Sequence, residues 1–321
     1  MLSNQALMWI GFNILVLIML ALDLGVFHRK DEALKIKEAL QASLIWVVLA
    51  IIFNICVYYW FGGRAATEFL TGYLLERSLS IDNIFVFLLV FSYFKIPAKF
   101  QYRVLFWGIL GALIMRAALI VLGTALIRQF HWILYIFGLL LVVTGIRMAL
   151  QKEDDEIQPE KNPVVRIFKR LMPVTTDYAH RGFFVKVNGR LYASLLFIVL
   201  LVVETTDLVF ALDSIPAIFG VTNDAFIIYT SNVFAILGLR ALYFALAGIM
   251  DLFHYLKVGL SMILVFIGIK MLVVEFFEIP TLIALAVIAV VLIISVIASI
   301  VWPRKSEELP LPPPSDENEP V

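Results

Sequence analysis

Nine stretches of about twenty mostly apolar residues dominate this sequence, and that is the length an α-helix needs to cross a lipid bilayer. Inside a membrane, only helices and closed barrels satisfy all of their backbone hydrogen bonds. We therefore predict an all-α polytopic membrane protein with about nine transmembrane helices. The predicted spans are residues 7–27, 39–61, 69–94, 104–127, 131–150, 191–215, 225–249, 255–275 and 280–302.

The composition excludes several other classes of protein. Hydrophobic residues make up 62% of the chain and charged residues only 16%, whereas soluble domains are about 45–50% apolar and 25% charged. A soluble enzyme, a nucleic-acid-binding protein and a secreted disulfide scaffold are therefore not expected. The 25 basic and 25 acidic residues balance, and a single cysteine rules out an internal disulfide. We expect a protein that is not an enzyme and has no resident cofactor.

Basic residues fix the predicted orientation, because cytoplasmic loops of membrane proteins are enriched in lysine and arginine. Loops on one side of the predicted spans carry eighteen such residues, and loops on the other side carry only Arg64 and Arg128. The N-terminus is predicted to lie outside and the C-terminus in the cytoplasm, which requires an odd number of spans. No basic residue precedes the first span, so that span does not resemble a cleaved signal peptide.

The spans contain an internal repeat. Phe-His-Trp at 130–132 matches Phe-His-Tyr at 253–255, and in the same register Gly-Ile-Arg-Met at 145–148 matches Gly-Ile-Lys-Met at 268–271. Spans 3–5 therefore repeat as spans 6–8, and a unit of three helices inverts its topology, as in many secondary transporters. The predicted organisation is a transmembrane domain over 1–302, with repeat one at 69–150, a cytoplasmic loop at 151–190, repeat two at 191–275, and a disordered tail at 303–321.

The cytoplasmic loop carries one local structural signal. Asn188-Gly189 lies between short alternating segments and predicts a small β-hairpin near the end of the loop.

Five acidic residues lie inside the third and sixth predicted spans, where each charge costs about 2.5–3.5 kcal/mol. They cannot face lipid as isolated charges, so they must be protonated, paired or solvated in a cavity. We identify them as candidate metal ligands: Glu76, Asp82, Glu204, Asp207 and Asp213.

Helix geometry groups these acids. Glu204 and Asp207 are three residues apart and share a helix face, whereas Asp213, six residues after Asp207, points elsewhere on an unbroken helix. Pro216 leaves a backbone carbonyl without its donor, which predicts local unwinding near Asp213.

Two interpretations of the acids remain open. Carboxylates with Asn83 and Ser214 are hard oxygen ligands, which suit Mn²⁺, Ca²⁺ or Mg²⁺ without separating them. Alternatively the acids pair with intramembrane bases in a purely structural lattice. Both can hold if bases keep an empty site closed, and the supporting bases are Arg116, Arg240 and Lys270.

The two acidic segments resemble the signature stretches of the TerC family, and most closely its Alx branch. The segments are GYLLERSLSIDNIFVF, which starts at Gly72, and VETTDLVFALDSIPAI, which starts at Val203. The resemblance covers about residues 5–300, and the acids, the asparagine and the proline fall in one order. It implies an inner-membrane protein of a family named for tellurium resistance, whose better-supported role is manganese export.

These features favour a secondary transporter that exports Mn²⁺ and is driven by inward proton movement. The Mn²⁺ identity is implied by the resemblance alone. The alternative is a non-transporting membrane scaffold that helps to insert or metallate partner proteins through the 151–190 loop. The expected partners are a divalent metal ion and membrane lipid, with a homo-oligomer or another membrane protein also open, and no nucleic acid.

Overall fold

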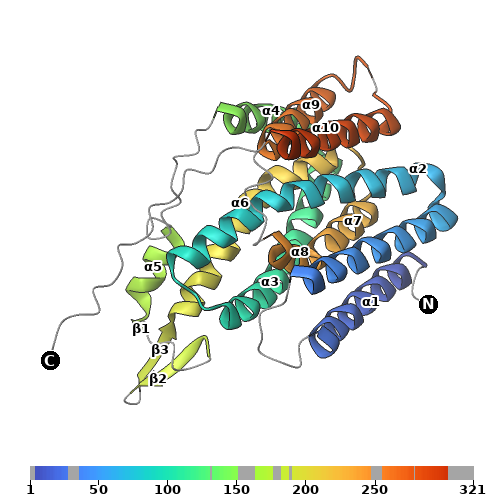
Figure 1. Ribbon diagram of the computed structural model, residues 1–321. Helices are drawn as coiled ribbons and strands as arrows, with labels where there is room; N and C mark the ends of the chain where they lie inside the picture. The colour runs from blue at the N-terminus through green and yellow to red at the C-terminus, as the bar shows by residue number, and fades with distance from the viewer. Residues whose placement is uncertain are drawn as a thin grey trace.

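The computed structural model describes residues 4–27, 36–130, 132–150, 163–175, 182–187, 190–246, 255–277 and 279–302, and it is mostly helical (Figure 1). The predicted tail at 303–321 lies outside the described residues. The helices are α1 Asn4–Phe27, α2 Ile36–Tyr93, α3 Ala98–Gln129, α4 Ile133–Leu150, α5 Pro163–Leu171, α6 Leu195–Phe219, α7 Ala225–Leu237, α8 Leu239–Leu246, α9 Leu256–Leu272 and α10 Thr281–Val301, and the strands are β1 Val174–Thr175, β2 Phe184–Val187 and β3 Arg190–Ser194.

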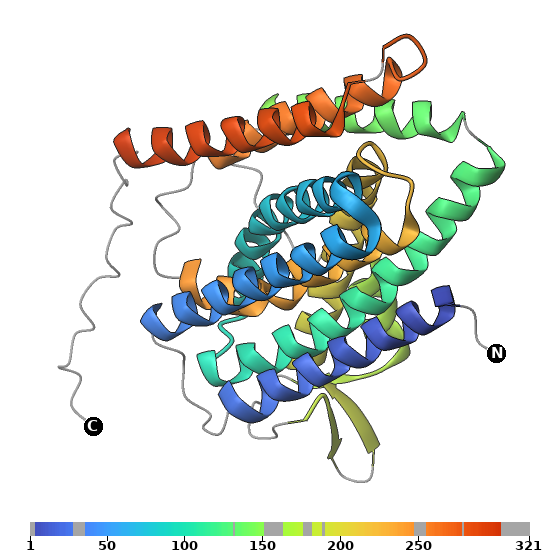
Figure 2. The ribbon, with the colours of Figure 1, turned by 90° about the vertical axis from the view of Figure 1, so that its right-hand side faces the viewer.

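Helix α2 is a helical hairpin made of two halves. Gly62 has φ 86° and ψ 176°, a conformation outside the helical region that only glycine adopts readily. The chain reverses there, and the two halves then run side by side (Figures 1 and 2). They contain the second and third predicted spans, and the second half carries Glu76 and Asp82.

The helices form two groups. Helices α2, α3, α6, α7 and α8 pack together in the main bundle, and α1 lies against α7. Helices α4, α9 and α10 lie together along one side of this bundle (Figure 2). The main core contains a cluster of aromatic rings from α1, α2 and α7, which includes Phe12, Phe53 and Phe234.

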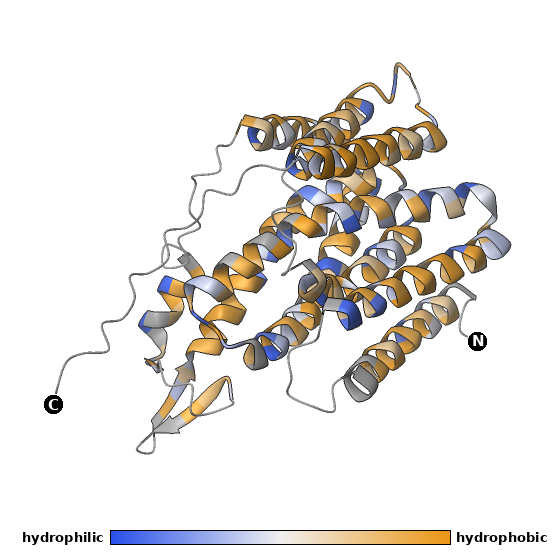
Figure 3. Ribbon diagram, in the orientation of Figure 1, coloured by the Kyte–Doolittle hydropathy of each residue, from blue (hydrophilic) through white to orange (hydrophobic). Residues whose placement is uncertain are grey.

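The surface of the helices is apolar, as a bilayer requires. Figure 3 shows hydrophobic residues along most of the length of the helices. Large apolar side chains point outward, among them Leu17 and Ile294, about 60% exposed. Among the described residues, six helices are long and apolar enough to span a membrane, and α2 counts as one of them. Helical residues occupy all nine predicted segments. The count of nine crossings itself stays a prediction.

Helices α4 and α9 make the most extensive helix contact in the structure. A Cβ atom built on Gly138 would lie 2.9 Å from the backbone oxygen of Gly268, and one built on Gly145 would lie 2.8 Å from that of Ser261. The two backbones therefore approach as closely as small residues allow in membrane helices.

A small sheet lies in the segment between α4 and α6, with strand order β1-β3-β2. Strands β2 and β3 are antiparallel, with Phe184 opposite Ala193 and Val187 opposite Arg190. This confirms the predicted hairpin, although its Asn188-Gly189 turn lies outside the described residues. The fold is thus not strictly all-α, because β1 adds a parallel strand to the hairpin.

Candidate ion-binding site

Arg116 of α3 is the centre of a buried polar cluster between four helices. Its residue surface is only 2% exposed. The Nε atom donates to Asp207 Oδ2 at 3.2 Å, and Nη2 donates to Asp207 Oδ1 at 3.1 Å. This fork geometry is the strongest arrangement between a guanidinium and a carboxylate, and it holds α3 against α6.

Glu76 of α2 is the second carboxylate of the cluster. Its side chain is completely buried, and its Oε1 atom accepts a hydrogen bond from Nη1 of Arg116. Its Oε2 atom accepts a hydrogen bond of 3.0 Å from Nδ2 of Asn232 on α7. Glu76 and Asp207, which lie in different predicted repeats, are therefore joined through one arginine.

Neutral side chains complete the cluster. Asn83 Nδ2 donates to Asp207 Oδ1 at 3.2 Å. Arg116 Nη1 also lies 3.3 Å from Ser214 Oγ and 3.3 Å from Asn232 Oδ1. These contacts place two of the predicted supporting residues, Asn83 and Ser214, beside the predicted acids.

The cluster carries more negative than positive charge. Two carboxylates face one guanidinium, and all three groups are removed from water. Taking ions out of water costs several kcal/mol each, so such a cluster persists only when every group is well paired. The geometry leaves one formal negative charge that an added cation would neutralise.

Two other predicted acids, Glu204 and Asp213, make no described contact with Arg116. Glu204 lies one turn before Asp207 on α6, and its carboxyl group is pressed against Gly111 of α3. Its Oε2 atom is buried and has no hydrogen-bond partner among the described atoms. The side chain of Asp82 lies outside the described residues.

Asp213 points toward a different helix. Its Oδ1 atom accepts a hydrogen bond of 3.1 Å from Thr144 of α4. The divergence from Asp207 follows from their spacing of six residues on one continuous helix. The predicted unwinding near Asp213 is wrong, because α6 stays helical from Leu195 through Pro216 to Phe219. A proline removes only one hydrogen bond, and tight packing of the buried last turns of α6 keeps them helical.

The two other predicted bases lie apart from the cluster. Arg240 of α8 donates to the hydroxyl of Tyr102 at 2.7 Å and lies 4.5 Å from the centre of that ring. Lys270 of α9 donates to the carbonyl of Gly220 at 2.8 Å, just after α6 ends.

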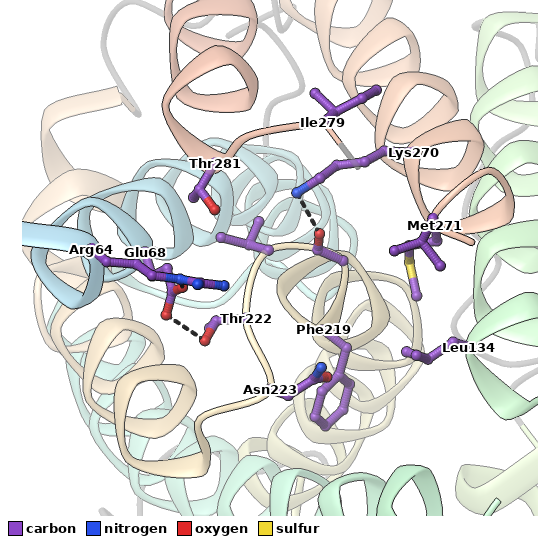
Figure 4. A pocket seen from close by; sticks show the side chains of 13 residues that line it. Arg64, Glu68, Leu134, Phe219, Thr222, Asn223, Lys270, Met271, Ile279 and Thr281 are labelled. Atoms are coloured by element: carbon purple, nitrogen blue, oxygen red, sulfur yellow. Dashed lines mark hydrogen bonds and ion pairs between the residues drawn. The ribbon is translucent and has the colours of Figure 1, made fainter. Parts of the chain in front are cut away.

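A pocket of about 360 Å³ lies near Lys270, at the end of the bundle where α2 bends (Figure 4). Figure 4 shows Lys270 and Arg64 reaching into it from opposite sides. Glu68, which is 8% exposed, accepts a hydrogen bond of 2.6 Å from Thr222 and pairs with Arg64 at 3.0 Å. The bases outnumber the acids around this pocket, so it is less suited to a cation than the Arg116 cluster.

The described conformation does not itself form a metal-binding group. Among the described residues, no three acidic, histidine or cysteine side chains are placed to hold one ion. Arg116 occupies the space between Glu76 and Asp207 that a cation would need. The sequence analysis did not identify Asn232 and Thr144, which donate hydrogen bonds to Glu76 and Asp213. Each is a polar residue within an apolar helix, and that was the signal in the sequence that could have identified them.

The chain was compared with known proteins. The family model described as "Integral membrane protein TerC family" matches residues 61–307. An uncharacterised membrane protein of Myxococcus xanthus is 50% identical over 297 residues, which cover 92% of this chain and 93% of the relative. Alx of Escherichia coli (strain K12), described by its name as a candidate membrane-bound redox modulator, is 49% identical over 301 residues, or 91% and 93% of the two chains. No solved structure matches.

Proposed function

Because the chain belongs to the TerC family of integral membrane proteins, we propose that it is a secondary transporter, not an enzyme, and that it exports a divalent metal cation. The observation that carries this proposal is the meeting of Glu76 and Asp207 on Arg116 in a buried layer between α2, α3 and α6. Intramembrane acids are costly and mark ion pathways when they face the interior of a bundle.

Arg116 serves as the counter-ion of the empty site in this proposal. A divalent cation carries twice the charge of the guanidinium and can replace it between the same two carboxylates. Asn83 and Asn232 donate their amide nitrogens to these carboxylates. Their amide oxygens are the kind of ligand that hard cations prefer: Asn232 Oδ1 faces Arg116, and Asn83 Oδ1 is buried with no hydrogen-bond partner among the described atoms. Loading therefore requires Arg116 to withdraw, and Glu204, one turn from Asp207, is the nearest candidate for a third carboxylate.

The contact between α4 and α9 supports an inverted repeat. The sequence register pairs position 138 with 261 and position 145 with 268. In the structure Gly138 meets Gly268 and Gly145 meets Ser261, which is the crossed pattern that a two-fold relation between the repeats produces. Transporters built this way expose a central site alternately to the two sides of the membrane.

The cation we propose is Mn²⁺, driven out by protons that enter and compete for the carboxylates. The Mn²⁺ identity rests on the family resemblance, and oxygen chemistry alone also allows Ca²⁺ and Mg²⁺. The proposed location is the inner membrane, with the N-terminus outside and the C-terminus in the cytoplasm, because of the distribution of lysine and arginine.

The test is metal flux through the full-length protein reconstituted in sealed proteoliposomes. Mn²⁺, Ca²⁺, Mg²⁺ and Zn²⁺ are each supplied with and without a pH gradient, and a dye on the far side reports transport. We expect the wild-type protein to transport Mn²⁺, and a proton gradient to accelerate this flux. The Glu76→Gln and Asp207→Asn variants should lose most of the flux.

Glu68→Gln is the matched control, because Glu68 is also a buried carboxylate of α2 but contacts Thr222 and Arg64 instead of Arg116. It should keep most of the flux. Absence of flux for every cation would contradict transport and favour the scaffold alternative. Unchanged flux in folded Glu76→Gln and Asp207→Asn would contradict the site.

A further inference from the structure

Helix α5, in the segment between α4 and α6, has two apolar faces and one basic face. Val165, which is 1% exposed, and Phe168 face the rest of the protein, where the Phe168 ring lies 4.9 Å from that of Phe197 on α6. Val164 and Ile167, three residues apart on the neighbouring face, are 40% and 57% exposed. Nothing in the described structure covers this second apolar face.

The position of α5 along α6 sets its depth relative to a bilayer. Phe197 lies in the first turn of α6, a helix long and apolar enough to span a membrane. Its ring also contacts the rings of Phe183 and Phe184, and Phe183 contacts Trp107 of α3. Tryptophan is enriched at the level where transmembrane helices enter the headgroup region, and Trp107 belongs to this cluster of rings. Helix α5 is packed against that cluster.

The charged residues in the described part of the segment around α5 are of one sign, and the acidic residues of this segment all fall in 151–162 and 176–181, outside the described residues. Arg166 and Arg170 are exposed, and they lie about 100° and 60° around the helix from Ile167, on the side away from Phe168. Within residues 163–175, 182–187 and 190–194, which are the described part of this segment, no acidic residue occurs. The basic residues of the same part are Arg166, Lys169, Arg170, Lys186 and Arg190.

We propose that α5 is an interfacial helix that binds the anionic lipid surface at this end of the bundle. Val164 and Ile167 insert among the first carbons of the acyl chains, and the arginines pair with headgroup phosphates. A helix with an apolar face, a basic face and aromatic anchors is the form that lies in a membrane interface. The position of α5 beside Phe197 and the positive charge of the described residues around it favour lipid over a protein as the occupant.

The test places one spin label at a time on the full-length protein in lipid nanodiscs, in a Cys56→Ser background that removes the single cysteine. Ile167→Cys reports the exposed apolar face. Arg166→Cys, an exposed position about 100° around the helix from it on the basic face, is the matched control. The nanodiscs contain either phosphatidylcholine alone or phosphatidylcholine with phosphatidylglycerol.

We expect the label at 167 to collide several-fold more often with dissolved oxygen, which concentrates in lipid, than with a water-soluble nickel complex. The label at 166 should show the reverse. Phosphatidylglycerol should strengthen the preference of the label at 167 for oxygen, and Arg166→Gln with Arg170→Gln should abolish the strengthening. Equal nickel access at both positions would overturn the proposal. So would a label at 167 shielded from both reagents, because a protein partner would then cover it. Neither result bears on metal transport.

Discussion

The guanidinium of Arg116 meets the carboxylate of Asp207 through two parallel hydrogen bonds of 3.1 and 3.2 Å, in a layer of the bundle that solvent does not reach. The same arginine also pairs with Glu76, so one cationic side chain of the protein itself bridges acids from two helices. The predicted ligands are thus assembled around a residue that a transported ion would have to displace.

Replacing Arg116 by alanine should destabilise the protein strongly, because Glu76 and Asp207 would be left as buried charges without their partner. Loss of one member of a buried pair costs about 3–5 kcal/mol. The combination of Arg116→Gln with Asp207→Asn should recover much of this loss, since one charge of each sign is then removed. Unfolding of the full-length protein in mixed detergent micelles measures the stability of the single and the double variant. A double variant as unstable as Arg116→Ala would contradict the pairing of Arg116 with Asp207.

Asn232 should matter through its amide group. Asn232→Leu removes the donor to Glu76 Oε2 and the acceptor beside Arg116, which should cost about 1–3 kcal/mol of stability. Thr230→Val, on the same helix, is the control, because the Thr230 hydroxyl only bonds the backbone of its own helix. The control should cost less in the same unfolding titration. Equal losses would show that Asn232 has no special role.

Gly111→Ala should disturb Glu204. A Cβ atom there would lie 2.5 Å from Cδ and 2.6 Å from Oε2 of Glu204, so the carboxyl group must move. If Glu204 takes part in transport, Mn²⁺ flux should fall about as far as in Glu204→Gln. Gly108→Ala on the same helix is the control, because its Cβ would meet a methyl group of Val203 at 3.2 Å instead. Retained flux in Gly111→Ala would remove Glu204 from the site.

Gly138→Ala and Gly268→Ala should each destabilise the α4–α9 contact, because their Cβ atoms would lie 2.9 Å and 2.6 Å from the opposite backbone oxygens. Overpacking of this kind costs about 1–3 kcal/mol. The two changes strain the same contact, so the double variant should lose less than the sum of the single losses. Gly11→Ala, with no atom within 4 Å of the added Cβ, is the neutral control. Strict additivity would contradict direct packing.

Gly62→Ala should destabilise the bend of α2, because its φ of 86° suits glycine alone, and such backbone strain costs about 1–3 kcal/mol. Gly63→Ala is the adjacent control, since its added Cβ would meet only the ring of Tyr58 at 3.5 Å. No atom lies within 4 Å of a Cβ at position 62, so any loss there reports conformation and not packing. The difference between the two thermal midpoints measures this loss, and no difference would contradict it.

Some local features of the site could be predicted from the sequence and others could not. That Glu76 and Asp207 must find partners follows from the cost of a charge in a membrane. That Asp213 points away from Asp207 follows from helix periodicity. Which base pairs with which acid does not follow, and neither do the contacts of Arg240 with Tyr102 and of Lys270 with the carbonyl of Gly220.

By itself, the sequence determined that this chain is a helical membrane protein with acids inside its spans, because apolar length and the cost of buried charge are properties of local segments. Only the tertiary structure decided that Arg116 joins Glu76 to Asp207, that Asn232 completes the cluster and that α6 stays helical past Pro216. Those outcomes depend on which helices approach one another and on their rotation, which is set by packing across the whole bundle.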